Sequence, residues 1–326
     1  MSALVVVLGQ VGGSGLTKFA NTLWDGLALG ALYALLALGF VVIFKATQVV
    51  NFAHGAIAAV GAYFVATFAV ERQIPGRWTG GPDWLQWGLS VLLALVAAAV
   101  VGLVIERLTI RPMIGEPVFS IAIITLALDV ILRSVVNDFL GTSNKSMGGP
   151  FGRDSFDIAG LRFPHTQVVS TVLAILCLVA FGAFFKSRMG IAMRSTSFDQ
   201  EAAMAQGIKV GQVFALAWMI GAVLATIAGT FATLFPHGNG QLVPGTALFA
   251  LRAFPAVILG GLDSVKGAIV GGFLIGAIER VAGVYLEPYS GTLGNGFQTV
   301  VPYVVMLIGL LIRPYGLFGT PEVRRV

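Results

Sequence analysis

Charged residues inside the apolar segments of this chain are the first candidates for chemistry. Asp129 and Arg133 lie four positions apart in one such segment, a spacing that brings a carboxylate and a guanidinium together on one helix face. Because an unpaired charge in lipid is costly, both side chains must face protein or water. Two interpretations stay open for the pair: a structural ion pair, or a carboxylate that attracts the ammonium group of a small solute.

Three further polar side chains interrupt apolar segments. Asn51 and His54 could bind a substrate, or they could cap a broken helix by hydrogen bonding to its freed backbone groups. Arg252 lies near Pro255, where its guanidinium could meet a substrate carboxylate or extend to the membrane interface. These three residues and Asp129 are the candidates for a substrate pathway.

Residue patterns typical of catalysis are absent from the sequence. It holds no G-x-x-x-x-G-K-[ST] loop, so we expect that this chain does not hydrolyse ATP by itself. It also lacks paired carboxylates, a His/Cys cluster and a nucleophile elbow, and its histidines at 54, 165 and 237 are scattered. We therefore expect neither an enzyme nor a metal site nor a cofactor bound by this chain.

The composition is that of an integral membrane protein. Of the 326 residues, 57% are hydrophobic and 11% are charged, and the mean hydropathy is +0.90. A soluble domain carries about 25% charged residues. The net charge is +5, but Lys and Arg flank the apolar segments, which indicates orientation in a lipid bilayer rather than nucleic-acid binding.

The apolar segments predict an all-α, polytopic transmembrane bundle of roughly eight to ten membrane segments, because one helical crossing needs about 20 residues. Full spans are expected at 24–44, 88–105, 119–136, 166–185, 213–235, 267–285 and 297–312. We expect residues 1–22 to be an N-terminal lead-in and residues 23–326 to be a single transmembrane domain.

Other segments are expected to be broken or to lie outside the membrane. The helix at 56–70 is short for a full crossing and is entered through a polar, broken or re-entrant stretch. The segment 246–261 is expected to be broken by Arg252 and Pro255. Residues 71–87 and 137–165 are predicted to connect spans on the outer side.

Closely spaced glycines predict tight helix packing. Gly267, Gly271, Gly272 and Gly276 form small-xxx-small spacings, which let another helix approach closely. The neighbour is expected to be a helix of this chain or of a partner subunit.

The longest polar interruption is the loop 186–212. Its basic residues outnumber its acidic ones, so the positive-inside rule places it in the cytoplasm, together with the arginine-flanked C-terminus. Within it, 199–207 predicts a short amphipathic helix with an acidic first turn and with Gly207 as its stop. We expect this helix to lie against a soluble partner.

Glu201-Ala202-Ala203, followed after three residues by Gly207, resembles the EAA loop of ABC importer permeases. The resemblance implies a coupling helix that docks into a groove of a cytoplasmic ATPase. The residues that it implies for this contact are Arg194, Asp199, Glu201, Ala202, Ala203 and Gly207. The later Ile-x-Leu-Pro of the family pattern is absent, and Ala217-Trp218-Met219 stands near its place.

Further motifs in the same order along the chain are similar to the LivH-type permeases of branched-chain amino acid ABC importers. They are Asn51-Phe52-Ala53-His54-Gly55, Ile105-Glu106-Arg107 with Arg111-Pro112, Leu259-Gly260-Gly261-Leu262-Asp263-Ser264, and Pro314 with Gly316, Gly319 and Pro321-Glu322-Val323. The resemblance implies a LivM-like second permease, two ABC ATPases that bind ATP and Mg, and an external solute-binding protein. It also implies a multi-pass protein of the bacterial cytoplasmic membrane.

The predicted function is therefore a permease subunit that takes up branched-chain or related hydrophobic amino acids, driven by ATP hydrolysis on separate subunits. The wider family includes urea permeases, so a urea or short-amide permease is one alternative. An ion-coupled secondary transporter that uses Asp129 as a proton or sodium site is another.

Overall fold

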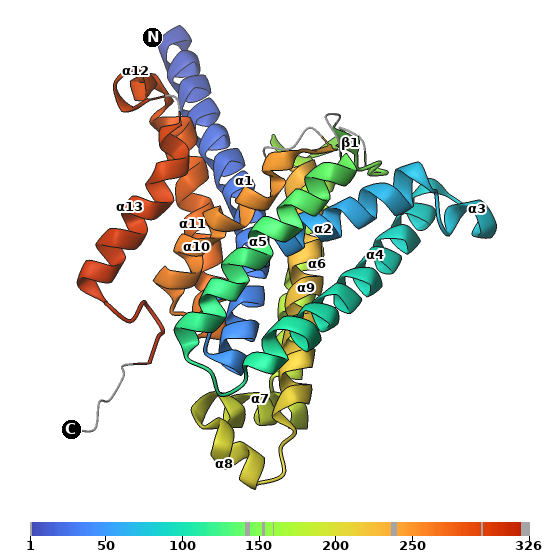
Figure 1. Cartoon of the computed structure of the whole chain (residues 1–326). Coiled ribbons are helices and arrows are strands. Elements are labelled where there is room, and N and C mark those ends of the chain that lie inside the picture. The colour runs from blue at the N-terminus through green and yellow to red at the C-terminus, as the bar shows by residue number, and fades with distance from the viewer. Residues whose placement is uncertain are drawn as a thin grey trace.

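The computed structural model describes residues 2–140, 144–151, 154–158, 160–235, 240–294 and 296–320. Over these residues the chain forms an all-α, polytopic helical bundle (Figure 1). Seven of the described helices are long and apolar enough to cross a membrane, and two shorter apolar helical segments accompany them, Gly245–Gly260 and Phe297–Ile312. This confirms the predicted fold class and agrees with the predicted number of membrane segments.

The helices follow one another along the chain with short strands on one side of the bundle. The α-helices are α1 (Ser2–Thr47), α2 (His54–Ala66), α3 (Gly76–Thr79), α4 (Asp83–Ile105), α5 (Val118–Leu140), α6 (His165–Phe184), α7 (Arg188–Phe198), α8 (Gln200–Ala205), α9 (Val210–Leu234), α10 (Phe249–Gly260), α11 (Val265–Tyr285), α12 (Ser290–Leu293) and α13 (Phe297–Ile312). The π-helical turns η1 (Thr67–Glu71) and η2 (Glu106–Ile110) extend α2 and α4, and the 3-10 turns are η3 (Arg111–Met113), η4 (Pro244–Leu248) and η5 (Glu287–Tyr289). Strand β1 (Lys145–Ser146) pairs antiparallel with β4 (Gln241–Leu242), and β2 (Ser155–Ile158) pairs antiparallel with β3 (Leu161–Pro164).

Several boundaries differ from the predicted ones. Helix α1 begins at Ser2, so the expected lead-in and the first span share one helix. The helix that begins at His54 continues through η1 to Glu71, longer than the predicted 56–70, and the segment His54–Thr79 is a candidate membrane span. Helix α4 begins at Asp83, inside the predicted connection 71–87. The connection 137–165 contains strands that its polar sequence did not indicate.

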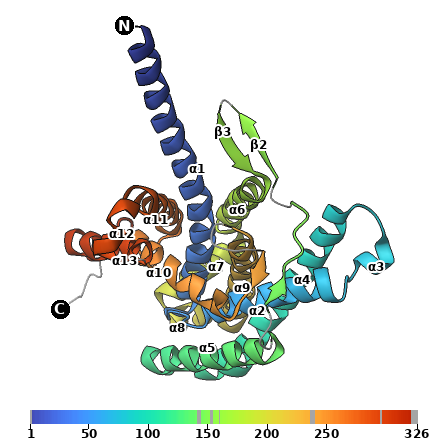
Figure 2. The ribbon, with the colours of Figure 1, turned by 90° about the horizontal axis from the view of Figure 1, so that it is seen from above.

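Helices α1, α2 and α9 form the centre of the bundle. Helix α1 contacts α6, α9, α10 and α11, and α2 packs against α9 (Figure 2). In the most apolar window of each span, most residues of α1 and α9 are buried inside the protein, whereas most residues of α4, α5 and α6 are not. Because many of their exposed side chains are large and apolar, these three helices suit contact with lipid or with another membrane subunit.

The break between α1 and α2 is closed by hydrogen bonds from protein groups. The side chain of Asn51 accepts the Ala53 N–H at 3.0 Å, and the hydroxyl of Thr125, on α5, accepts the Phe52 N–H at 3.2 Å. Backbone groups at membrane depth must find such partners, since lipid offers none. Asn51 therefore satisfies one backbone N–H freed at the break, as one of its two predicted interpretations requires, although α2 has no side-chain cap on its first turn.

Helix α10 runs without interruption through Arg252 and Pro255, so the predicted break at these residues is wrong. A proline inside a helix leaves the carbonyl four residues earlier without its usual N–H donor. Here that carbonyl belongs to Leu251, and it accepts a hydrogen bond from the Tyr303 hydroxyl of α13 at 2.9 Å. A neighbouring helix thus replaces the missing donor.

The segment after α13 returns to the turn between α10 and α11. The Leu317 N–H donates to the Leu259 carbonyl at 2.7 Å, and the Phe318 N–H donates to the Gly260 carbonyl at 3.0 Å. Gly261 has φ of +107° and lies against the backbone of Gly319, where a side chain would overlap it. The motif that contains Gly260 and Gly261 therefore contacts the motif that contains Gly319, although the two are distant in the sequence.

The predicted packing glycines of α11 face helices of the same chain. A Cβ at Gly267, Gly271, Gly272 or Gly276 would overlap, in that order, the backbone of Gly260, Ala256, Ala34 or Gly30. Gly267 and Gly271 thus allow α10 to approach, and Gly272 and Gly276 allow α1 to approach. The glycine spacing left open whether the neighbour is a helix of this chain or of a partner subunit. In the structure, helices of this chain pack against all four glycines.

The substitution Gly276→Ala is expected to lower thermal stability in detergent, because overpacking a close contact costs about 1–3 kcal/mol. Gly182→Ala, on α6, is the matched control, since a Cβ there meets no atom within 4 Å. Thermal unfolding of the two purified variants measures the difference. Equal melting temperatures would contradict a close backbone contact between α1 and α11.

Candidate functional site

Helices α7 and α8 project from one end of the bundle, here called the α8 end (Figure 1). The Ser187 side chain accepts the Gly190 N–H at the start of α7, at 3.3 Å. The Asp199 carboxylate accepts the Ala202 N–H at 2.9 Å and so caps α8. The predicted short helix within 199–207 is confirmed, and Asp199 is its N-cap.

Gly207 lies just beyond the end of α8. Its φ is +82°, in the left-handed region that favours glycine, and its N–H donates to the Met204 carbonyl at 2.9 Å. Ala203 is buried and anchors α8, while Glu201 and Ala202 are exposed. In the EAA-like motif, Ala203 therefore packs α8 against the protein, Gly207 follows its end, and Glu201 and Ala202 face outward.

The exposed side of α8 forms a surface with both apolar and acidic groups. Phe198 is 90% exposed and Met204 is 49% exposed, and together with Asp199 and Glu201 they line a groove of about 540 Å³. We call these four residues the α8 surface. An aromatic ring this exposed suits a protein contact. Sequence reasoning missed Phe198, because nothing in its local pattern shows that the ring lies outside the bundle.

Arg194 does not join the α8 surface. Its guanidinium donates to the Phe185 carbonyl at 2.7 Å and lies over the ring of the same residue, 5.2 Å from the centroid. The Lys45 ammonium lies over this ring at 5.6 Å. Arg194 therefore fixes α7 to the end of α6, and Lys45 brings the end of α1 to the same ring.

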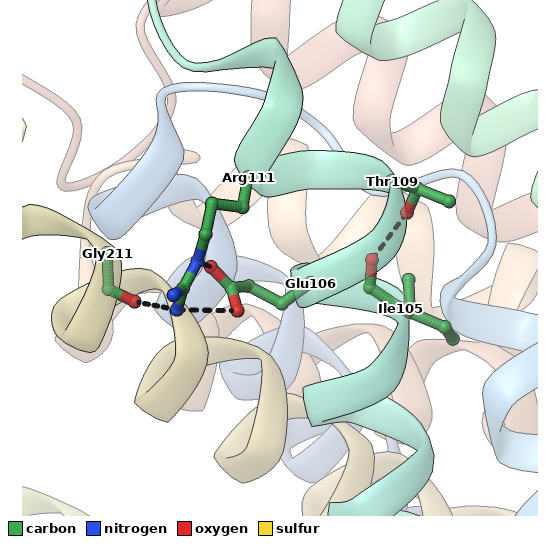
Figure 3. Close-up of polar contacts among 5 residues, drawn as sticks. All are labelled: Ile105, Glu106, Thr109, Arg111 and Gly211. Carbon is green, nitrogen blue, oxygen red and sulfur yellow. Dashed lines mark hydrogen bonds and ion pairs between the residues drawn. The ribbon is translucent and has the colours of Figure 1, made fainter.

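A partly buried ion pair after α4 is linked by a hydrogen bond to the start of α9, as Figure 3 shows. The Arg111 guanidinium donates to both oxygens of the Glu106 carboxylate, at 3.0 and 3.1 Å, and also to the Gly211 carbonyl at 2.9 Å. The Glu106 side chain is fully buried, so its charge needs this partner. We call this arrangement the Glu106–Arg111–Gly211 bridge.

The bridge was missed at the sequence level, although Glu106 and Arg111 belong to a motif noted there. Their spacing of five residues does not match the three or four that bring side chains together on an α-helix. The turn between them is the π-helix η2, whose hydrogen bonds link residues five apart. The local change of helix type therefore allows the contact.

The four candidates for a substrate pathway lie on separate elements. Asn51 caps the break before α2, and His54 is fully buried with its ring 4.4 Å from that of Phe40. Asp129 pairs with Arg133 on α5 at 2.7 Å, as their spacing predicted. Arg252 lines a different cavity, beside α10. No hydrogen bond or ion pair that the described residues make joins these candidates into one site.

Comparison with models of protein families shows which family this chain is related to. A family model described as the permease component of the branched-chain amino acid transport system matches residues 22–311. The chain belongs to this family. As a member of the permease family, it is a multi-pass membrane protein, in agreement with its long apolar helices.

Named relatives of this permease cover most of its length. The high-affinity branched-chain amino acid transport system permease protein LivH of Escherichia coli (strain K12) is 29% identical, over 94% of this chain and 98% of the relative. A probable branched-chain amino acid transport permease protein LivH of Methanocaldococcus jannaschii is 32% identical, over 88% and 89%. The Escherichia coli (strain K12) LivM permease is 26% identical, over 90% of this chain and 69% of the relative.

Removing the cation of the bridge is expected to destabilise the permease strongly. Arg111→Met leaves the Glu106 carboxylate buried without its partner, which costs about 3–5 kcal/mol. Arg107→Met is the matched control, since Arg107 lies on the same turn η2 but is exposed. Thermal unfolding in detergent compares them, and equal losses would show that the bridge contributes little.

Proposed function

We propose that this chain is a transmembrane subunit of an ABC importer that takes up branched-chain or related hydrophobic amino acids. The single observation that carries the proposal is the match of nearly the whole chain to a permease family whose named relatives transport branched-chain amino acids. In this role it lies in the bacterial cytoplasmic membrane, with the α8 end and the C-terminus in the cytoplasm. ATP is hydrolysed on separate subunits.

The α8 surface is the proposed contact with the cytoplasmic ATPases. It has an exposed aromatic ring, an exposed carboxylate at Glu201 and a capped helix that ends at Ala205, just before Gly207. Two ATPases, a LivM-like second permease and an external solute-binding protein complete the proposed complex. The second permease is supported by the similarity of this chain to a LivM protein.

In the proposed mechanism, closure of the ATPases displaces α8 and, through the short connection after Gly207, the start of α9. The Glu106–Arg111–Gly211 bridge passes this displacement to the end of α4, because Arg111 holds the Gly211 carbonyl. The transmembrane helices then change between outward-open and inward-open arrangements. The free energy for this change comes from the ATPase contact.

The family match argues against the ion-coupled alternative, because the named relatives are permeases of branched-chain amino acid transport systems. On α5, one oxygen of the Asp129 carboxylate lies 2.7 Å from the Arg133 guanidinium, and the other oxygen is buried without a hydrogen-bond partner among the described residues.

Uptake by proteoliposomes that contain the complete importer tests the proposal. Glu201→Ala removes the exposed carboxylate of α8, and Gly207→Pro replaces a residue at φ +82° with one fixed near −65°. Both variants are expected to lose most leucine uptake and most ATPase stimulation. Glu287→Ala, at an exposed position in η5, is the control and is expected to behave as the wild type.

Leucine and urea offered in turn identify the solute, and leucine is expected to be accepted. Full uptake by both α8 variants, or uptake without ATPases, would overturn the importer assignment. Uptake of urea in place of leucine would keep the coupling role and replace the proposed solute.

A further inference from the structure

A cavity with a mixed polar and apolar lining lies at the far end of α9 from the α8 surface. Its volume is about 320 Å³, and it is lined by the end of α9, by β4 and η4, and by the first turn of α10. Strand β4 pairs with β1, which Figure 1 shows at the end of the bundle opposite α8. The cavity therefore lies on the side where the proposed importer would receive its solute. We call it the Arg252 cavity.

The lining combines one cation with hydroxyl, amide and apolar groups. Arg252 and Phe249 come from α10, Thr246 from η4, Gln241 from β4 and Thr233 from α9. The Thr246 hydroxyl accepts the Val243 N–H at 3.2 Å, and it donates to no acceptor among the described residues. A second donor is therefore available beside the guanidinium.

The half-buried position of Arg252 requires a polar environment. A guanidinium within a helical membrane segment must face protein or water, because lipid does not solvate it. A carboxylate also lies in this region: the Tyr33 hydroxyl, which is close enough to feel the charge of Arg252, donates to the buried Glu279 carboxylate at 2.7 Å.

We propose that the Arg252 cavity binds the carboxylate of an amino acid during its passage, with the apolar side chain against Phe249. The inference rests on the proposed function and names a residue that selects its substrate class. A guanidinium matches a carboxylate with two parallel hydrogen bonds, and this interaction is stronger in a low-dielectric site. The volume is at the small end of the range of about 300–1,000 Å³ typical of ligand pockets, which suits a small solute.

The cavity chemistry distinguishes an amino acid from urea. Urea is neutral, so a pathway for urea has no need of a guanidinium. A carboxylate, unlike urea, forms charge-assisted hydrogen bonds with Arg252 while it is bound. The recognised group is therefore the carboxylate itself, and an analogue without it is expected to bind poorly.

Equilibrium binding of radiolabelled leucine to the assembled importer, without its solute-binding protein, tests the inference. Wild type is expected to bind leucine, and unlabelled leucine but not leucinamide is expected to compete. Arg252→Gln is expected to weaken leucine binding by about tenfold or more, because charge-assisted hydrogen bonds are lost. Arg162→Gln, on the exposed strand β3, is the matched control and is expected to bind as the wild type.

Wild-type affinity in Arg252→Gln, equal competition by leucinamide, or no leucine binding by the wild-type importer would each overturn the inference. If Arg252→Gln does not assemble, Arg252→Lys decides, since lysine keeps the charge but loses the paired hydrogen bonds. A weaker affinity in Arg252→Lys supports the inference, and an unchanged one overturns it. Leucine uptake by the wild-type importer reports separately on the proposed function.

Discussion

The absence of water at membrane depth is the constraint on which this structure depends. Every backbone group that leaves a regular helix there must find a protein partner. The Thr125 hydroxyl supplies one at the break before α2, and the Tyr303 hydroxyl supplies another where Pro255 removes an N–H from α10. In both cases the partner comes from another helix, so satisfying the backbone also fixes how α5 and α13 sit against the bundle.

The same constraint applies to charged groups, which must also find protein partners. Helix α9 lies next to such groups at both of its ends. At its start, the Gly211 carbonyl is held by Arg111, whose guanidinium compensates the buried Glu106 carboxylate. At its end, Thr233 lines the Arg252 cavity. Helix α9 therefore reaches both the segment that bears the α8 surface and the cavity proposed for the solute. Because the surrounding core is tightly packed, a displacement at one end of a buried helix is transmitted to its other end.

The sequence predicted the parts of this structure that depend on local chemistry. Apolar length predicted the spans, the Asp129–Arg133 spacing predicted their ion pair, and Gly207 predicted the end of α8. The prediction from sequence failed where the local structure depends on a residue distant in the sequence or on a local change of helix type. Pro255 was expected to break its helix because nothing nearby shows that Tyr303 replaces the missing donor, and the π-helical turn concealed the contact of Glu106 with Arg111. The exposure of Phe198 likewise depends on the packing of the whole bundle.

A photo-crosslinking amino acid at position 202, in the assembled importer, tests the central claim most directly. Ala202 is exposed on α8, and Thr292, exposed on α12 at the other end of the bundle, gives the matched control position (Figure 1). The account predicts that position 202 cross-links to an ATPase subunit and that position 292 does not. Absence of an ATPase cross-link from position 202, or an equal yield from position 292, would contradict it.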